Sequence, residues 1–308
     1  MFPQLVAGPI VRYETVDKQI TKRDYSFDKF NSGLERVIKG LFKKVIISNT
    51  IGELATLIYS LSYSEMTVAT AWLGAIAYTF QIYFDFSGYS DMAIGLGKML
   101  GFDFLENFNY PYVSKSVSEF WRRWHISLGS WFKDYVYIPL GGNKVGTIKL
   151  YRNLAIVWVV TGIWHGASWN FILWGIYFGF FIILERIFLG ELLRKLPNII
   201  QHIYLMIIVI FGWVLFSQVD INSTVEYIKI MLGLGEYRLF NNHTIFYIKQ
   251  YWIVIIMSIL ASIPVLKQIE GIGGLIKLIR PLVVIMSFVL VVIYLVNSTF
   301  NPFIYFNF

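Results

Sequence analysis

Residues 154–184 read LAIVWVVTGIWHGASWNFILWGIYFGFFIIL, a run of 31 residues without Asp, Glu, Lys or Arg. A single helix over this run would measure roughly 46 Å, whereas the hydrocarbon core of a bilayer is about 30 Å thick. Two complete spans would need roughly 40 residues. The run therefore predicts membrane-embedded helix with a break or a re-entrant turn, for which Gly162 and Gly166 are the natural positions.

Other apolar runs predict further spans on both sides of this one. The uncharged runs are Met66–Phe84, Gln201–Val219, Gln250–Leu266 and Leu282–Phe308, and a weaker candidate, Val45–Leu61, contains only Glu53. The chain is 56% hydrophobic and 15% charged, whereas a soluble domain carries about 25% charged residues. We therefore expect an all-α, polytopic membrane protein in which residues 1–308 form a single integral domain.

Composition excludes several classes of protein. The net charge of +7 comes from bases that lie between the apolar runs and not in one patch, which is typical of cytoplasmic loops and not of a nucleic-acid interface. The chain has no cysteine, so disulfides and a cysteine nucleophile are excluded. Its four histidines lie far apart in the sequence without ligand-like spacing, and no metal site is predicted.

The distribution of Lys and Arg gives a partial topology. Residues 1–48 hold nine of these bases and residues 87–153 hold eight, so both segments are predicted to face the cytoplasm. Between them, the runs 45–61 and 66–86 would form an out-and-back hairpin that turns near Ser62–Glu65.

His165 is the ionisable residue of the uncharged run, and Trp164 precedes it between two glycines. An ionisable residue inside a membrane segment is a functional-site hypothesis by default. A desolvated imidazole stays neutral, accepts a proton, and can serve as general base for a hydroxyl. The alternative is a structural histidine that hydrogen-bonds a neighbouring helix.

Residues 119–125, EFWRRWH, combine aromatic and basic side chains. If they form one helix, Arg122 and His125 share a face. With Trp121 and Trp124 beside them, they would suit an anionic or thioester-linked group. The alternative is an interfacial amphipathic helix with its tryptophans at headgroup level and its arginines on lipid phosphates.

Residues 85–91, DFSGYSD, follow the predicted span at 66–84. Asp85, Ser87 and Asp91 could line a polar entrance to a substrate site. The alternative is a local role, in which Ser90 or Asp91 caps the next helix.

Five strings together resemble the membrane-bound O-acyltransferase superfamily, and within it the bacterial branch that acetylates alginate and peptidoglycan. They are FPQLVAGPIVRY at 2–13, YFDFSGYSD at 83–91, FWRRWHISL at 120–128, DYVYIPLGG at 134–142 and TGIWHG at 161–166. The closing NPFIYF at 301–306 is also similar to that branch. Teichoic acid D-alanyl transfer proteins are related, and the IPLGG part of the fourth string favours the acetylating branch.

The resemblance implies a helical fold with short or re-entrant helices around a central tunnel, and with a histidine at the waist of the tunnel. His165 matches the characteristic histidine of the superfamily, and His125 matches a second one that is specific to the bacterial branch. The donor implied is a cytoplasmic acyl thioester such as acetyl-CoA, with no bound cofactor. Relatives have further transmembrane helices before the first string, so we expect this chain to lack them.

The resemblance also implies a multi-pass protein of the bacterial plasma membrane that passes an acyl group outward to a polysaccharide or cell-wall polymer. An extracytoplasmic acetyltransferase would act as its partner, and nucleic acid would not. Three alternatives stay open: D-alanyl transfer to teichoic acid, a transporter with no chemistry of its own, and a scaffold for a partner enzyme.

Overall fold

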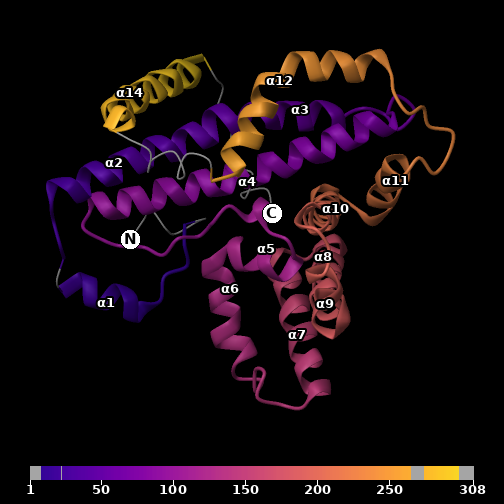
Figure 1. Ribbon diagram of the computed structural model, residues 1–308, viewed down its shortest axis with the longest axis horizontal. Helices are drawn as coiled ribbons and strands as arrows, with labels where there is room; N and C mark the ends of the chain where they lie inside the picture. The colour runs from indigo at the N-terminus through magenta and orange to yellow at the C-terminus, as the bar shows by residue number, and fades with distance from the viewer. Residues whose placement is uncertain (1–7, 22, 265–273, 298–308) are drawn as a thin grey trace.

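The computed structural model describes residues 8–21, 23–264 and 274–297, and helices are the regular elements of these segments (Figure 1). Residues 2–7 and the closing string at 301–306, which the resemblance uses, lie outside the described residues. The elements are α1 (Tyr13–Thr21), α2 (Phe27–Phe42), the π-helix η2 (Lys43–Ser48), α3 (Asn49–Tyr59), α4 (Val68–Met99), the 3-10 helix η3 (Pro111–Val113), α5 (Val117–Arg123), α6 (Ile126–Phe132), the π-helix η4 (Lys133–Tyr137), α7 (Thr147–His165), α8 (Trp169–Leu184), the π-helix η5 (Glu185–Leu189), α9 (Gly190–Arg194), α10 (Asn198–Ser217), α11 (Ile221–Met231), α12 (Asn242–Ser262) and α14 (Gly274–Asn297).

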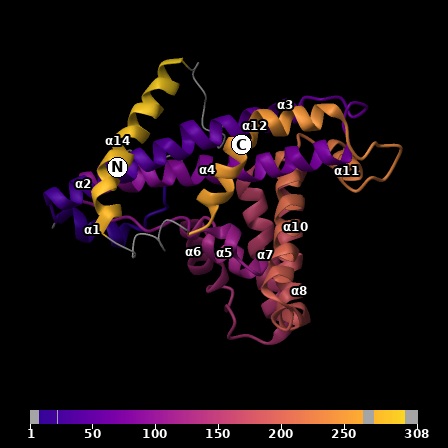
Figure 2. The same ribbon diagram turned by 45° about the horizontal axis from the view of Figure 1, so that its top comes forward.

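A long helical hairpin forms one side of the molecule (Figure 2). Its outgoing arm runs without interruption through α2, η2 and α3, and its returning arm is the 32-residue α4. The turn between the arms contains Ser62, whose hydroxyl donates to a carboxylate oxygen of Glu65 (2.6 Å). The predicted turn position is therefore confirmed.

The two arms are longer than the predicted segments 45–61 and 66–86, and that prediction of their bounds is wrong. The outgoing arm begins at Phe27, and α4 continues past Asp85 to Met99. A carboxylate at position 85 does not end the helix because Lys44 of the opposite arm pairs with it inside the fold. The chain leaves α4 only at Gly101, where φ is 85°.

Two pairs of glycines set the distance between α2 and α4. A Cβ added to Gly33 would lie 2.6 Å from the carbonyl oxygen of Gly95, and a Cβ on Gly95 would lie 2.6 Å from that of Gly33. Gly40 and Gly88 form a second pair, with corresponding distances of 2.5 and 2.9 Å. Real Cβ atoms do not approach other atoms this closely, so larger side chains would push the two arms apart.

The uncharged run at 154–184 is divided between α7 and α8, and the predicted break is confirmed at Gly166. This residue has φ 155° and ψ 171°, a conformation that favours glycine. Gly162 has a different part: it lies inside α7, and a Cβ there would lie 2.4 Å from the carbonyl oxygen of Phe171 on α8. Gly162 therefore allows α8 to pack closely on α7.

Within the described residues, four helices are long and apolar enough to cross a membrane, and the chain is a multi-pass membrane protein. The four are Trp169–Arg194, Asn198–Ser217, Asn242–Ser262 and Leu278–Val296. The last three correspond to the runs predicted at 201–219, 250–266 and 282–308, but each begins earlier. Helix starts are set by capping, as at α12, where the side chain of Asn241 accepts the backbone N–H of Thr244 (3.0 Å).

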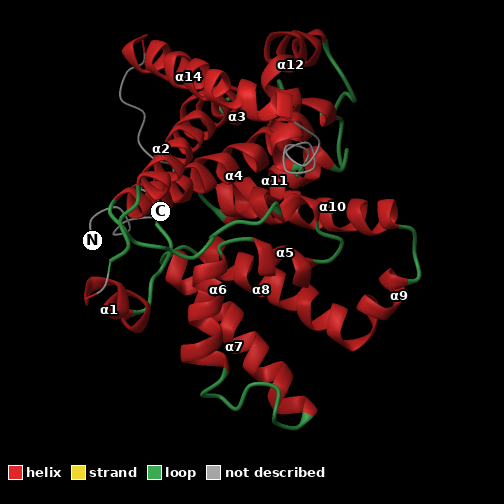
Figure 3. Cartoon of the chain, turned by 60° about the vertical axis from the view of Figure 1, so that its left-hand side comes forward, coloured by secondary structure: helices red, strands yellow, loops and turns green. Residues whose placement is uncertain are grey.

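Short helices lie at the centre of the molecule, between the hairpin and the pair α7–α8. Figures 1 and 3 show α5 and α6 in this position. Around α5, side chains of α4, α8 and α10 form a continuous aromatic core that includes Phe84, Phe120, Trp174 and Trp213. The core holds α5 in place, and α5 leads into the first of the two candidate catalytic histidines.

Candidate active site

His125 lies at a sharp corner between α5 and α6. Helix α5 ends at Arg123, Trp124 is extended, and His125 has φ 43° and ψ 54°. The prediction that Arg122 and His125 share one helical face is therefore wrong. A non-glycine residue with positive φ is uncommon, and it persists only where the surrounding structure holds it.

Asn107 holds this corner, although it is distant in the sequence. Its side-chain oxygen accepts the backbone N–H of Ser127 (3.2 Å) and the Ser127 hydroxyl (2.9 Å), and its carbonyl accepts the N–H of Ile126 (3.0 Å). Its side-chain amide donates to the hydroxyl of Ser90 on α4 (3.1 Å). Asn107 is fully buried. Asn107 was not predicted as a site residue, because an asparagine in a loop has no local pattern that indicates such a role.

His165 is the last residue of α7, and aromatic rings from α8 and α10 pack around its imidazole. The ring centroid lies 4.9 Å from Trp174 of α8, 5.3 Å from Phe216 of α10 and 6.3 Å from Phe171. The first two contacts are edge-to-face, the arrangement that aromatic pairs prefer. The conformation of Gly166 turns the chain back directly after His165, so that α8 can supply these rings.

Trp164 links the two histidines. Its indole lies 5.0 Å from the ring of His165 and 6.3 Å from the ring of His125. On its other side, His125 packs edge-on against Phe86 of α4, with 4.6 Å between the ring centroids. The structure therefore brings together three of the predicted site residues, His125, Trp164 and His165, from two separate motifs.

Trp121 and Trp124 lie in the aromatic core beside this group. The Trp121 ring is 5.4 Å from Trp174, and the Trp124 ring is 4.8 Å from Trp213. The indole N–H groups of Trp121 and Trp174 are buried and have no hydrogen-bond partner in the described part of the chain. Trp121 and Trp124 are therefore packed behind the histidines and form part of the wall of the site.

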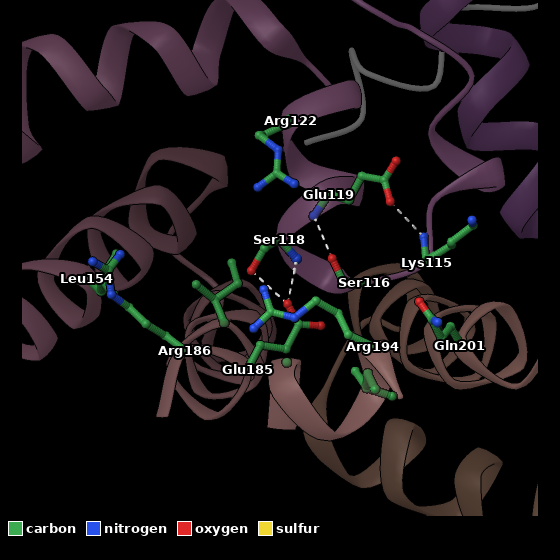
Figure 4. A pocket seen from close by; sticks show the side chains of 13 residues that line it. Lys115, Ser116, Ser118, Glu119, Arg122, Leu154, Glu185, Arg186, Arg194 and Gln201 are labelled. Atoms are coloured by element: carbon green, nitrogen blue, oxygen red, sulfur yellow. Dashed lines mark hydrogen bonds between the residues drawn. The ribbon is translucent and has the colours of Figure 1, made fainter. Parts of the chain in front are cut away.

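Arg122 is separated from the histidines. It is exposed and lines a cavity of about 410 Å³ between α5, the short helices η5 and α9, and the start of α10 (Figure 4). Neither His125 nor His165 lines that cavity. Arg122 and His125, which were predicted to share one helical face, thus lie apart: Arg122 lines the cavity, and His125 packs against Trp164 and Phe86.

Asp85 is almost completely buried in the helical hairpin. It forms an ion pair with Lys44 of η2, and the hydroxyl of Ser48 donates to it (3.4 Å). The next residue along α4, Phe86, points to the other side and contacts His125. Asp85 therefore joins the two arms of the hairpin behind the site.

Asp91 and Ser87 also face the outgoing arm. The Asp91 carboxylate binds the guanidinium of Arg36 (2.9 Å) and the ammonium of Lys43 (2.7 Å). The Lys43 ammonium also lies 3.5 Å from the Ser87 hydroxyl. The three polar residues predicted to line an entrance thus have partners inside the hairpin.

The candidate spans, the irregular backbone at His125 and Gly166, and the aromatic rings around both histidines define a class: a multi-pass membrane protein in which two histidines pack against an aromatic core. The model of the MBOAT, membrane-bound O-acyltransferase family, matches residues 1–223. The chain belongs to this family.

Similar proteins include three acetylating relatives. A probable alginate O-acetylase of Pseudomonas putida is 37% identical over the whole chain and 67% of its own length, and one of Azotobacter vinelandii is 44% identical over 78% of this chain and 48% of its own length. A peptidoglycan O-acetyltransferase of Helicobacter pylori is 38% identical over 76% of this chain and 45% of its own length. The chain thus spans about half the length of the last two relatives.

Proposed function

We propose that the chain is an O-acyltransferase that moves an acyl group, most simply acetyl, from a cytoplasmic thioester to hydroxyls of an extracytoplasmic polysaccharide or cell-wall polymer. The observation that supports this proposal is that His165 and His125, from two separate motifs, both lie next to the ring of Trp164. Family membership and the acetylating relatives support the choice of reaction.

In this reaction, an imidazole nitrogen of His165 accepts the proton of the acceptor hydroxyl, and the hydroxyl oxygen attacks the thioester carbonyl. The tetrahedral intermediate collapses as the carbon–sulfur bond breaks, and the thiolate takes the proton from the imidazolium. The products are an O-acyl ester and a free thiol, so the histidine ends as it began. Because Trp174 and Phe216 pack edge-on against the ring, the imidazole has a fixed orientation toward its substrate.

His125 is the group best placed to assist. The fixed corner at Asn107 holds it, and from there its imidazole can orient the thioester or donate a hydrogen bond to the oxyanion. Arg122, the other residue considered for this role, lines a different cavity. We assign the oxyanion contact to His125 alone.

The proposed reaction needs a donor from one side of the bilayer and an acceptor from the other. Acetyl-CoA or another acyl thioester would act as a substrate and not as a bound cofactor. The protein would lie in the bacterial inner membrane, and a separate extracytoplasmic acetyltransferase could receive the acyl group and deliver it to the polymer.

The experiment measures the O-acetyl content of the polymer in cells that lack the gene and carry the chain or one of its variants. We expect the chain to restore acetylation and His165→Ala to reduce it by roughly 10²–10⁴-fold, the usual contribution of a general base. His125→Ala should also lower it. His243→Ala is the matched control, because His243 is exposed at the start of α12, and it should behave as the unchanged chain.

Each variant is extracted in detergent and passed over a gel-filtration column to show that it is folded. Full acetylation by folded His165→Ala would overturn the role given to this residue. If deletion of the gene leaves acetylation unchanged, acyl transfer itself is the wrong function and a transporter without chemistry becomes the better interpretation. Transfer of label from acetyl-CoA to the polymer by membranes that contain the chain would support acyl transfer, and its absence would support the transporter.

A further inference from the structure

The cavity that contains Arg122 lies at the end of a candidate span. Its walls come from α5, from the helices η5 and α9 at the end of the span Trp169–Arg194, and from Gln201 near the start of α10. Its volume is about 410 Å³. Lys115, Arg122, Arg186 and Arg194 are among its lining residues, and Figure 4 shows Arg122 and Arg194 on the sides of Ser118 and Glu185.

The carboxylates of the cavity are already engaged. One oxygen of Glu185 accepts the backbone N–H of Val117 (2.6 Å), and the other accepts the N–H and the hydroxyl of Ser118 (2.9 and 2.7 Å). Glu119 is paired with Arg123, which lies outside the cavity (2.9 Å). Glu185 therefore satisfies the first N–H groups of α5, and within the described residues neither carboxylate forms an ion pair with a cation that lines the cavity.

The cations that line the cavity have few hydrogen-bonding or ion-pair partners of their own. Lys115, Arg122 and Arg186 are exposed, and within the described residues their side chains form no hydrogen bond or ion pair. Arg194, the fourth, has only a long contact of 3.7 Å with Glu191 on the surface. Four cations, from α5 and the loop before it, from η5 and from α9, thus line one cavity, and three of them have no anionic partner within the described residues.

We propose that this cavity binds a phosphate ester, namely the headgroup of an anionic membrane lipid. Arginine presents a planar fork of N–H donors that matches phosphate oxygens. Ile182, Leu193 and Leu154 supply an apolar wall beside the cations. The apolar sides of the adjacent spans, as at Phe180 and Ile203, are open to acyl chains.

The location also favours a lipid over a soluble phosphate compound. Lys115 and Arg122 belong to the segment 87–153, whose bases predict that it faces the cytoplasm, and anionic lipids are concentrated in that leaflet. The inference does not depend on the proposed acyl transfer, because neither candidate catalytic histidine lines the cavity.

The test uses the full chain purified in detergent and two probes, phosphatidylglycerol and glycerol 1-phosphate, with phosphatidylcholine as the zwitterionic comparison. Native mass spectrometry counts bound lipid, and titration calorimetry follows the soluble phosphate. The variant is Arg122→Gln with Arg186→Gln. The matched control is Lys144→Gln with Lys149→Gln, which removes the same charge from exposed positions outside the cavity.

We expect saturable retention of phosphatidylglycerol over phosphatidylcholine, reduced roughly 30-fold in the arginine double variant and less than about 2-fold in the control. Arg122→Lys with Arg186→Lys should recover part of the loss. Binding of glycerol 1-phosphate alone, with the same sensitivity, would assign the phosphate site to a soluble ligand. Equal losses in variant and control, or binding of neither probe, would overturn the proposal. If the double variant aggregates, retention of phosphatidylglycerol is measured with Lys115→Gln instead. The Lys115 side chain forms no hydrogen bond or ion pair within the described residues, so this substitution should leave the fold intact.

Discussion

The imidazole of His165 packs edge-on against the indole of Trp174, with 4.9 Å between the ring centroids and 82° between the planes. Trp174 is only 1% exposed, and its own indole N–H has no hydrogen-bond partner in the described residues. The two rings are nearly perpendicular and closely packed, so this contact restricts rotation of the imidazole.

Trp174→Phe should keep most of the activity, because a phenyl ring preserves the packing. Trp174→Ala should lower kcat with little change in KM for the thioester, since it frees the imidazole and does not remove a substrate contact. Truncating a large buried aromatic side chain costs about 3–5 kcal/mol of stability, so unfolding is followed in parallel. Trp252→Ala is the control on the exposed side of α12. A fall in kcat with Trp174→Phe equal to that with Trp174→Ala would point to the indole N–H instead.

Asn107→Ala should loosen the corner at His125. It removes acceptor and donor contacts to Ser127 and Ser90 and leaves buried polar groups unpaired, which costs about 1–3 kcal/mol for each such group. We expect a lower thermal midpoint together with a loss of acyl transfer. Asn109→Ala, two residues along and exposed, should change neither. If Asn107→Ala is destabilised but fully active at low temperature, the corner does not serve catalysis.

Gly162→Ala should separate α7 from α8, because its Cβ would lie 2.4 Å from the carbonyl oxygen of Phe171. We expect destabilisation and reduced activity, since His165 lies in the same last turn of α7. Gly146→Ala is matched to it: Gly146 precedes the same helix, and nothing lies within 4 Å of a Cβ placed there. Thermal unfolding in detergent compares the two, and similar midpoints would contradict the proposed close packing.

Lys44 and Asp85 should behave as a coupled buried pair, since their side chains are 14% and 2% exposed. Lys44→Met alone leaves a buried carboxylate without a partner and should cost roughly 3–5 kcal/mol. Lys44→Met with Asp85→Asn should recover much of that loss. For comparison, Arg280→Met breaks the exposed pair with Glu35 and should cost about 0–1 kcal/mol. Additive effects of the two hairpin substitutions would show that the pair is not coupled.

Acid should release the loop between α11 and α12, outside the candidate spans. The hydrogen bond from Tyr237 (2.6 Å) and the nearby Lys229 lower the pKa of Glu226. A carboxyl whose pKa is lower in the folded state stabilises above its unfolded pKa of about 4.3, and this contribution is lost as the pH falls further. Hydrogen exchange at 232–239 should therefore rise as the pH is lowered through that range, after correction for the intrinsic rate. Glu226→Gln should remove the transition.

Regular features of the fold could be predicted where hydropathy alone decides them. The apolar runs at 201–219 and 250–266 were close to α10 and α12, and the break in 154–184 was confirmed because helix length and bilayer thickness leave few solutions. The ends of the hairpin could not be predicted. They depend on the ion pair between Lys44 and Asp85 and on the packing of two glycine pairs that are far apart in the sequence, and neither contact has a local signal.

For the candidate site, single residues were easier to find than their arrangement. His165, Trp164 and His125 were predicted and lie together, but the helical face that joined His125 to Arg122 does not exist, because φ is positive at His125. Such a corner is stabilised by Asn107 from another segment, so a helical projection of 118–129 could not reveal it.

The glycine pairs between α2 and α4 have a mechanical consequence. Sliding either arm by one residue would bring a Cβ against the opposite carbonyl oxygen at Gly95 or Gly88 and would separate Asp85 from Lys44. The two arms of the hairpin are therefore locked in one register and behave as a rigid unit. We therefore expect any movement that the proposed acyl transfer requires to leave the register of the hairpin unchanged and to involve elements outside it.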